Sequence, residues 1–591
     1  MPPYSYRPLA SAREIRVFTL LDEPFDAPIR GHLKHVSLDA NPIYDALSYC
    51  WGDDQRTRQI RCNGVDIEVP DSLYVAFREL RRQGKPSNLV IWADALCINQ
   101  GDEEEKTEQV KMMDQIYQKA QLVHAWLGER SSDSDLAMQF VVDLANKLQS
   151  MYPANVSRLN FDDPSRLGLP SKHDAKWYAL SRLLRRPWFS RAWIAQELAL
   201  APRVMVSCGA YGVEWKVFES LYHMCQEFGL PLHREVPELS GVDTVTNFAV
   251  MFNLRQSVQK GSKLAMVSLL RATKNFGATL PRDKVFALLG LARDGWKFHR
   301  HVEYRQQYRP VADVFRGVAE TMVSNHQVFE MLSQVRHPKR ILGLPSWVPD
   351  WSFDAGAVMA GIPFYVHPTH AASGIGETFT PQCSGGELVL SGCIVSYVSR
   401  LSSVLNPTNS EEEALNTYPR WDKECRDLAG NLHYYPTGET VEEAQWRTRI
   451  GNMSHLGKTA DASYGQSYRA WCDYLRLALD RRAGRYIDMH QFARLDVESD
   501  AFATAQTAQL GGRRFAVTRD GYVGLVPAWS KPTDEVCIFA GASTPHIVRR
   551  AGSGYVLVGE CYIHGLMNGQ ALGHRGFTYV TMTLVDQAVI Q

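Results

Sequence analysis

The residues best suited to chemistry lie in the first third of the chain, where a tryptophan and a glutamate stand four positions apart. Trp193 and Glu197 fall in a predicted helix, in which side chains at this spacing share one face. Because Ile194 and Leu198 make the neighbouring stripe apolar, Glu197 is expected at the border of a buried face. Desolvation there raises the pKa of a carboxyl group, which suits it to catalysis. The flat Trp193 side chain could hold an aromatic or ribosyl ligand.

A second group of candidate residues follows a predicted strand. The apolar segment 43–49 ends directly before Trp51, Gly52 and Asp53. In open α/β sheets, ligands bind just outside the carboxyl ends of the strands. We therefore expect these three residues to contribute to a ligand site.

Asp94 is a third candidate because of its surroundings. It lies within the almost continuously apolar segment 89–98, which predicts a strand buried on both faces. A carboxylate in such a strand is costly unless it is paired or functional. We therefore expect Asp94 to bind the same ligand as the residues around Glu197.

A purely structural interpretation of these residues stays open. Trp193 could be an ordinary core residue, and Asp94 could accept hydrogen bonds from backbone amides. Glu197 could pair with a nearby arginine and hold its helix in place. The candidates for that pairing are Arg186, Arg191 and Arg203.

The elements that would position these residues alternate between strand and helix. This order predicts an α/β fold with a parallel sheet flanked by helices. Asn63-Gly64 is a strong hairpin signal inside this region. Strands are predicted at 43–49, 89–98 and 122–127, and helices are predicted from Pro70-Asp71-Ser72 onward, at 106–120 and from Ser190 to Ala201.

The remaining chain divides by composition into two further regions. Residues 1–210 would form the α/β domain, and residues 211–370 are predicted to be mostly helical. Residues 371–591 hold short β-like segments separated by Gly, Pro and Asp, which predict a small barrel or sandwich. A polar insertion near 406–465 interrupts this β-rich module and is expected to be partly mobile.

Composition excludes several classes of protein. The 591 residues carry 64 Lys+Arg and 64 Asp+Glu without a basic stripe, which argues against nucleic-acid binding. Eleven scattered cysteines without a C-x-x-C pair indicate a reducing compartment, and no apolar segment is long enough to span a bilayer. We therefore expect a cytoplasmic protein. Missing Walker A, G-x-G-x-x-G, zinc-ligand and G-x-S-x-G patterns disfavour kinases, P-loop NTPases, zinc hydrolases and α/β-hydrolases.

Three blocks of the chain resemble a known family, the fungal heterokaryon-incompatibility (HET) domain. The resemblance covers about residues 43–200 and includes an ordered set of matching positions between the blocks. Three segments outside the domain, 281–291, 521–525 and 558–567, also look like parts of HET-domain proteins. The blocks are Ile43-Tyr-Asp-Ala-Leu-Ser-Tyr-Cys-Trp-Gly-Asp53, Ile91-Trp-Ala-Asp-Ala-Leu-Cys-Ile-Asn-Gln100 and Arg191-Ala-Trp-Ile-Ala-Gln-Glu-Leu198.

HET domains are in turn similar to TIR domains, some of which cleave NAD. Trp193-x-x-x-Glu197 resembles the TIR helix that carries the catalytic glutamate, so the resemblance implies Glu197 as the catalytic carboxylate and NAD as a substrate. That carboxylate would contact the nicotinamide ribose and stabilise the cation formed as the glycosidic bond breaks. No tightly bound cofactor and no metal are implied. The 55–69 hairpin and about sixty residues between Gly128 and Trp193 depart from the TIR pattern.

The resemblance implies an effector of non-self recognition and programmed cell death in fungi, acting through protein partners or self-association of the HET domain. Cleavage of NAD would be one route to that effect. One alternative is a non-catalytic scaffold or regulator. Another is a small-molecule biosynthetic enzyme that reuses the fold, since a fold does not fix a function.

Overall fold

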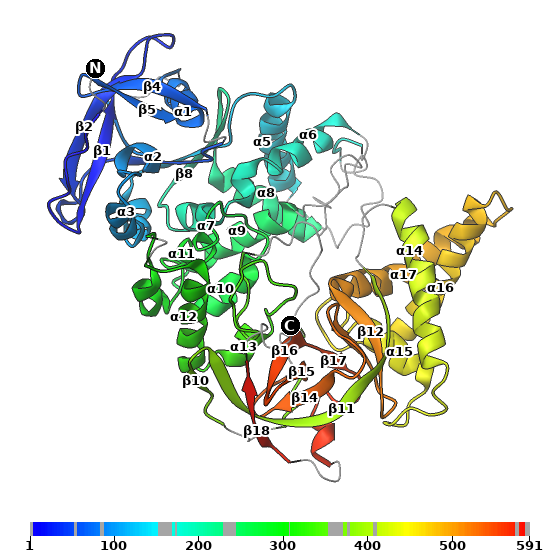
Figure 1. The fold of residues 1–591 in the computed structure, drawn as a ribbon. Coiled ribbons are helices and arrows are strands. Elements are labelled where there is room, and N and C mark those ends of the chain that lie inside the picture. The colour runs from blue at the N-terminus through cyan, green and yellow to red at the C-terminus, as the bar shows by residue number, and fades with distance from the viewer. Residues whose placement is uncertain are drawn as a thin grey trace. The chain divides into compact units, whose positions relative to one another are not determined.

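The chain folds into two units, Met1–Pro310 and Val311–Gln591 (Figure 1). The computed structural model describes residues 4–52, 56–82, 88–151, 168–171, 174–228, 244–305, 308–352, 364, 370–374, 379–405, 411–573 and 578–585. The domain boundaries predicted at 210 and 370 stay predictions.

A nine-stranded sheet forms the centre of the first unit, in the order β5-β4-β2-β1-β6-β3-β7-β8-β9. Its four inner strands β6, β3, β7 and β8 run parallel to one another, as expected from the alternation of strands and helices. Antiparallel strands extend it on both sides, so the sheet is mixed. The strands are β1 Glu14–Leu20, β2 Arg30–Ser37, β3 Asp45–Tyr49, β4 Thr57–Cys62, β5 Val65–Pro70, β6 Leu89–Trp92, β7 Val123–Trp126, β8 Val204–Cys208 and β9 Tyr211–Glu214.

The predicted hairpin is confirmed between β4 and β5. Asn63 and Gly64 both adopt left-handed backbone angles, with φ of 51° and 84°. Two such residues in succession match the twist of the flanking strands, which explains why Asn-Gly marks this turn.

Helices cover the sheet and continue through the middle of the chain, so the mostly helical middle region is confirmed. The helix that carries Glu197, α7, consists mainly of Ala, Leu, Ile, Gln and Glu, and all of its residues except Trp193 are buried. A helix that is apolar nearly all round belongs in a core. The helices of this unit are α1 Asp71–Arg82, α2 Asp94–Cys97, α3 Glu103–Val110, α4 Met113–Lys119, α5 Ser134–Met151, α6 Ala175–Leu184, α7 Ala192–Ala199, α8 Trp215–Phe228, α9 Thr244–Gln259, α10 Met266–Ala272 and α11 Asp283–Phe286.

The second unit confirms the β-rich module. Strands β14, β15, β16, β18 and β11 pair in turn, and β11 also pairs with β14, which closes them into a small barrel. The 19-residue β11 then continues with β12, β13 and β17. Closure removes the exposed edges that unpaired strands would present. These strands are β10 Gln382–Ser384, β11 Glu387–Leu405, β12 Arg513–Thr518, β13 Val523–Pro527, β14 Glu535–Phe539, β15 His546–Ala551, β16 Gly554–Glu560, β17 Tyr562–Ile563 and β18 Val580–Leu584.

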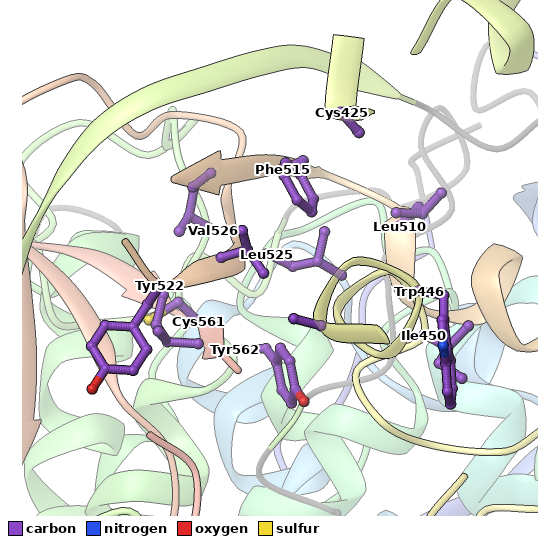
Figure 2. Close-up of a cluster of buried hydrophobic side chains, with 14 of the residues drawn as sticks. Cys425, Trp446, Ile450, Leu510, Phe515, Tyr522, Leu525, Val526, Cys561 and Tyr562 are labelled. Atoms are coloured by element: carbon purple, nitrogen blue, oxygen red, sulfur yellow. The ribbon is translucent and has the colours of Figure 1, made fainter. Parts of the chain in front are cut away.

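In the described part of the polar insertion, residues 411–465, helices pack against the strands, and the expected partial mobility stays a prediction. Figure 2 shows its helices sharing a core with the strands: Cys425 of α14 and Trp446 of α15 lie in one cluster with Phe515 of β12 and Leu525 of β13. The insertion presents many charges because only one face of each helix is buried. The helices of the second unit are α12 Val311–Ser324, α13 Val328–Leu332, α14 Glu411–Ala429, α15 Val441–Arg449, α16 Ser463–Arg482 and α17 Met489–Leu510.

The described residues hold no membrane-spanning helix, no metal-binding cluster and no disulfide. Among them, no helix is long and apolar enough to cross a membrane. Nor do these parts of the chain bring together three or more His, Cys, Asp or Glu side chains that could hold a metal ion. The ten cysteines that the structure describes are free thiols.

Candidate functional site

An acidic cluster lies at the edge of the first sheet where the parallel strands end. Glu197 comes from α7, Asp94 follows β6, and Ser48 lies at the end of β3. Arg191, directly before α7, supplies a positive charge that acts on both carboxyl groups. The structure therefore brings together two of the predicted site residues, from elements distant in the sequence, around one guanidinium.

Glu197 lies in the interior of the unit, with 4% of its surface exposed. Burial raises the pKa of its carboxyl group to about 7, while Arg191 and the Ser48 hydroxyl act in the opposite direction. Its Oε2 atom is buried and makes no hydrogen bond within the described part of the chain. At neutral pH this carboxyl group is therefore divided about equally between its protonated and ionised forms.

Two hydroxyl groups face Glu197 in different hydrogen-bonding states. The Ser48 Oγ accepts from the Trp188 indole N–H at 2.9 Å, so the Ser48 proton is available to the carboxylate. Tyr117 donates its proton to the Leu47 carbonyl at 3.2 Å. Both hydroxyl groups lower the pKa of Glu197 and so favour its ionised form.

Arg191 is anchored by backbone as well as by charge. Its guanidinium donates to the carbonyl of Tyr49 at the end of β3. The next residue, Ala192, donates its N–H to the Gly277 carbonyl at 2.8 Å, which fixes the start of α7. Burial opposes the charge of Arg191, but the thiol of Cys50 and the carboxyl groups of Glu197 and Asp94 stabilise it and keep its pKa raised.

Cys50 lies beside the same guanidinium but is not prepared to act as a nucleophile. Burial raises the pKa of its thiol to about 11, although Arg191 lowers it. The thiolate is the reactive form of a cysteine, and little of it exists at neutral pH with this pKa.

The predicted strand around Asp94 is wrong in extent, and the reason is physical. The strand β6 ends at Trp92, and Asp94 begins the four-residue helix α2. A short apolar segment does not distinguish a buried strand from a buried helix turn, and here it contains both. Asp94 therefore lies at the carboxyl end of the strand, where ligands of α/β sheets bind.

The Asp94 carboxylate is held by two donors. The Trp51 indole N–H donates to Oδ2 at 2.9 Å, and the Ala95 backbone N–H donates to Oδ1 at 2.8 Å. Burial raises the pKa of Asp94, while Arg191 and these hydrogen bonds limit the rise. Trp51 is itself fixed by Ser72, whose hydroxyl donates to its carbonyl at 2.7 Å. Trp51 and Asp94 thus form one connected unit, and their role in ligand binding stays a prediction.

Trp193 is placed differently from the other candidates. Its indole N–H donates to Asp283 Oδ2 of α11 at 3.1 Å, and the Tyr304 hydroxyl donates to the other oxygen at 2.6 Å. Trp193 is not among the described residues that shift the pKa of Glu197. Trp193 therefore joins α7 to the segment that follows, and its role as a ligand platform stays a prediction.

The last two candidates follow Trp51. Gly52 adopts a left-handed backbone with φ of 79°, and a Cβ atom there would meet nothing within 4 Å. It is required for the turn rather than for close packing. Asp53 lies outside the described residues.

Sequence reasoning missed several members of the cluster as site residues. Ser48, Tyr49 and Cys50 stand inside the first block that resembles the HET family, at the end of a predicted strand, and Arg191 opens the third block. Their positions in these blocks could have identified these four residues as candidates for the site. Tyr117 had none, because it has the spacing of an ordinary apolar helix residue.

The fold and the site define a class of protein with an α/β domain, whose buried glutamate lies at the ends of parallel strands, and a closed β-barrel module. Residues 44–197 match the model of the heterokaryon incompatibility protein (HET) family, and residues 404–576 match the Het-6 beta-barrel domain. The chain is a fungal HET-domain protein.

One curated protein is similar along most of the chain. Heterokaryon incompatibility protein 6, OR allele, of Neurospora crassa is 24% identical over 620 residues, which cover 90% of each chain. No solved structure matches. The similarity spans both matched domains, so the order of HET domain and barrel is common to the two proteins.

Proposed function

We propose that this protein is a cytoplasmic effector of fungal non-self recognition that triggers programmed cell death by cleaving NAD at Glu197. The observation that carries the proposal is the buried Glu197 carboxyl group, with a pKa of about 7, at the carboxyl ends of parallel strands. The similarity of HET domains to NAD-cleaving TIR domains supports the same assignment. Self-association of the HET domain would activate the protein.

In this reaction the ionised Glu197 stabilises the positive charge that develops on the nicotinamide ribose. The bond between the ribose and the nicotinamide nitrogen breaks, and its electron pair leaves with nicotinamide. Water then adds to the ribosyl cation and releases a proton, which gives ADP-ribose. Surroundings of low polarity strengthen the attraction between carboxylate and cation.

Arg191 and Ser48 have supporting roles in the proposed site. Both lower the pKa of Glu197, and they therefore maintain a useful fraction of carboxylate despite its burial. Trp51 is half-buried and is bonded to Asp94. Entry requires local opening, because Glu197 is almost fully enclosed.

The same enclosure favours a second candidate function, a scaffold without catalysis. With 4% of its surface exposed and Arg191 beside it, Glu197 could serve only to fix α7 in the core. The HET domain would then act through assembly with partners.

Expression in a fungal cell distinguishes the two functions. The full chain, Glu197→Gln and the control Glu108→Gln, which changes an exposed carboxyl of α3, are compared for growth and for cellular NAD. The proposal predicts growth arrest with loss of NAD for the wild type and for Glu108→Gln, and neither effect for Glu197→Gln. Arrest by Glu197→Gln at unchanged NAD would support the scaffold instead, and normal growth with all three proteins at equal abundance would contradict both.

A further inference from the structure

A cavity unrelated to Glu197 lies among three helices of the second unit. It measures about 200 Å³ and opens between α14, α16 and α17. Three aromatic side chains form much of its wall: Tyr418 from α14, and Trp471 and Tyr474 from α16. Tyr474 and Thr507 are half-buried, so the cavity reaches the surface of the unit.

One polar side chain in this wall has no structural explanation. Gln506 is fully buried, and neither the nitrogen nor the oxygen of its amide makes a hydrogen bond within the described residues. A buried amide without hydrogen-bond partners is destabilising, so native proteins seldom retain one. The side chain can turn toward the cavity without breaking any hydrogen bond that the structure contains.

Leu415 of α14 also lines the cavity. Pro419 lies four residues further along the same helix and has no N–H, so it cannot donate to the Leu415 carbonyl.

We infer that this cavity binds a small flat ring that carries an N–H donor next to a C=O acceptor. The aromatic walls suit a planar ring, since offset and edge-on ring contacts add to the free energy of burial. The Gln506 amide offers the complementary pair, an acceptor and a donor side by side. Cyclic amides and the pairing edges of nucleobases have this chemistry.

The size of the cavity narrows the ligand further. A dry apolar cavity of about 150 Å³ accepts benzene. A volume of about 200 Å³ therefore suits a ring system slightly larger than benzene. A fused bicyclic cyclic amide such as 2-quinolone meets both requirements.

The test compares 2-quinolone with quinoline, which has nearly the same shape but only an acceptor nitrogen. Binding to the full chain is measured by isothermal titration calorimetry. Quinoline should bind about tenfold more weakly, because it leaves the Gln506 oxygen unpaired. Equal affinity for the two compounds, or no binding of either, would overturn the inference.

Three variants locate the binding. Gln506→Leu should fold at least as stably as the wild type, since it removes an unpaired amide, and should bind both compounds equally. Ala503→Phe, which fills the cavity from α17, should abolish binding of both. Gln491→Leu makes the same replacement at an exposed position of α17 and should behave as wild type. A preference for 2-quinolone that survives in Gln506→Leu, or binding that survives in Ala503→Phe, would refute the assignment.

Discussion

The replacement of Glu197 by glutamine should stabilise the protein at high pH and not at low pH. Burial moves the pKa of this carboxyl group from 4.5 to about 7. The folded state therefore retains a proton that the unfolded chain releases. Below pH 4.5 both states hold the proton, and the stability linked to it is complete. As the pH rises through 7, that stability is lost.

The size of the effect follows from the same two values. Each pKa unit corresponds to about 1.4 kcal/mol, so ionised Glu197 costs the folded state about 3 kcal/mol. Glutamine has a similar shape and no charge to desolvate. The difference in free energy of unfolding between Glu197→Gln and wild type should therefore grow by about 3 kcal/mol between pH 4.5 and 8 and then level off.

Urea unfolding at a series of pH values measures this difference. Pulsed hydrogen–deuterium exchange of the peptide that contains α7 would report the unit carrying Glu197 separately from Val311–Gln591. The control Glu108→Gln makes the same replacement at an exposed position of α3 and should show no comparable change with pH. A constant difference for Glu197→Gln as well would refute the reasoning, since the carboxyl would then titrate alike in both states.

Three further substitutions test other parts of the account. In Arg191→Met, loss of the positive charge should raise the pKa of Glu197 further. The free energy of unfolding of Arg191→Met, compared with that of the double variant Arg191→Met/Glu197→Gln, should therefore begin to fall at a higher pH than in the wild-type comparison. Trp193→Phe removes a donor from the buried Asp283 and should lower the free energy of unfolding by about 1–3 kcal/mol. Trp296→Phe, at a position 71% exposed, should change it little, and equal effects would contradict the role given to this hydrogen bond. Gly290→Ala would place a Cβ 2.2 Å from that of Asp114 and should destabilise by about 1–3 kcal/mol in thermal or urea unfolding, whereas Gly101→Ala, whose nearest atom is 3.6 Å away, should be neutral. A neutral Gly290→Ala would mean that α4 can move aside.

Local sequence patterns were sufficient to predict two of the elements near the site, the strand β3 and the hairpin of β4 and β5. The apolar segment before Trp51 and the Asn63-Gly64 turn predicted β3 and the hairpin, because strand burial and left-handed turns depend on neighbouring residues alone. The segment around Asp94 was misjudged since a strand and a helix turn, both buried, follow one another without a break in hydropathy.

The helices of the second unit were harder to predict. In α17, the buried positions include Ser499, Gln506 and Gln509 beside Phe502, so the apolar stripe that marks a helix is interrupted. Whether such polar residues are buried depends on the elements that pack against them in the folded protein. The sequence alone could not predict all the residues of the site for the same reason.

The partners of Glu197 come from the end of β3, from α4 and from the segment before α7. Their proximity follows from the parallel arrangement of the strands, not from any spacing in the sequence. Ser48 and Arg191 could be suspected from their place in the matching blocks. Tyr117 could be found only in three dimensions.

The most direct test of the central claim is the release of nicotinamide from NAD by the purified full chain between pH 5.5 and 8.5. A crowding agent at high protein concentration would promote assembly. Wild type and Glu108→Gln should release nicotinamide at a rate that rises with pH and levels off above about 7, as Glu197 ionises, and Glu197→Gln should release none. Undiminished release by Glu197→Gln would place the chemistry elsewhere, and no release by the wild type would contradict NAD cleavage by this protein.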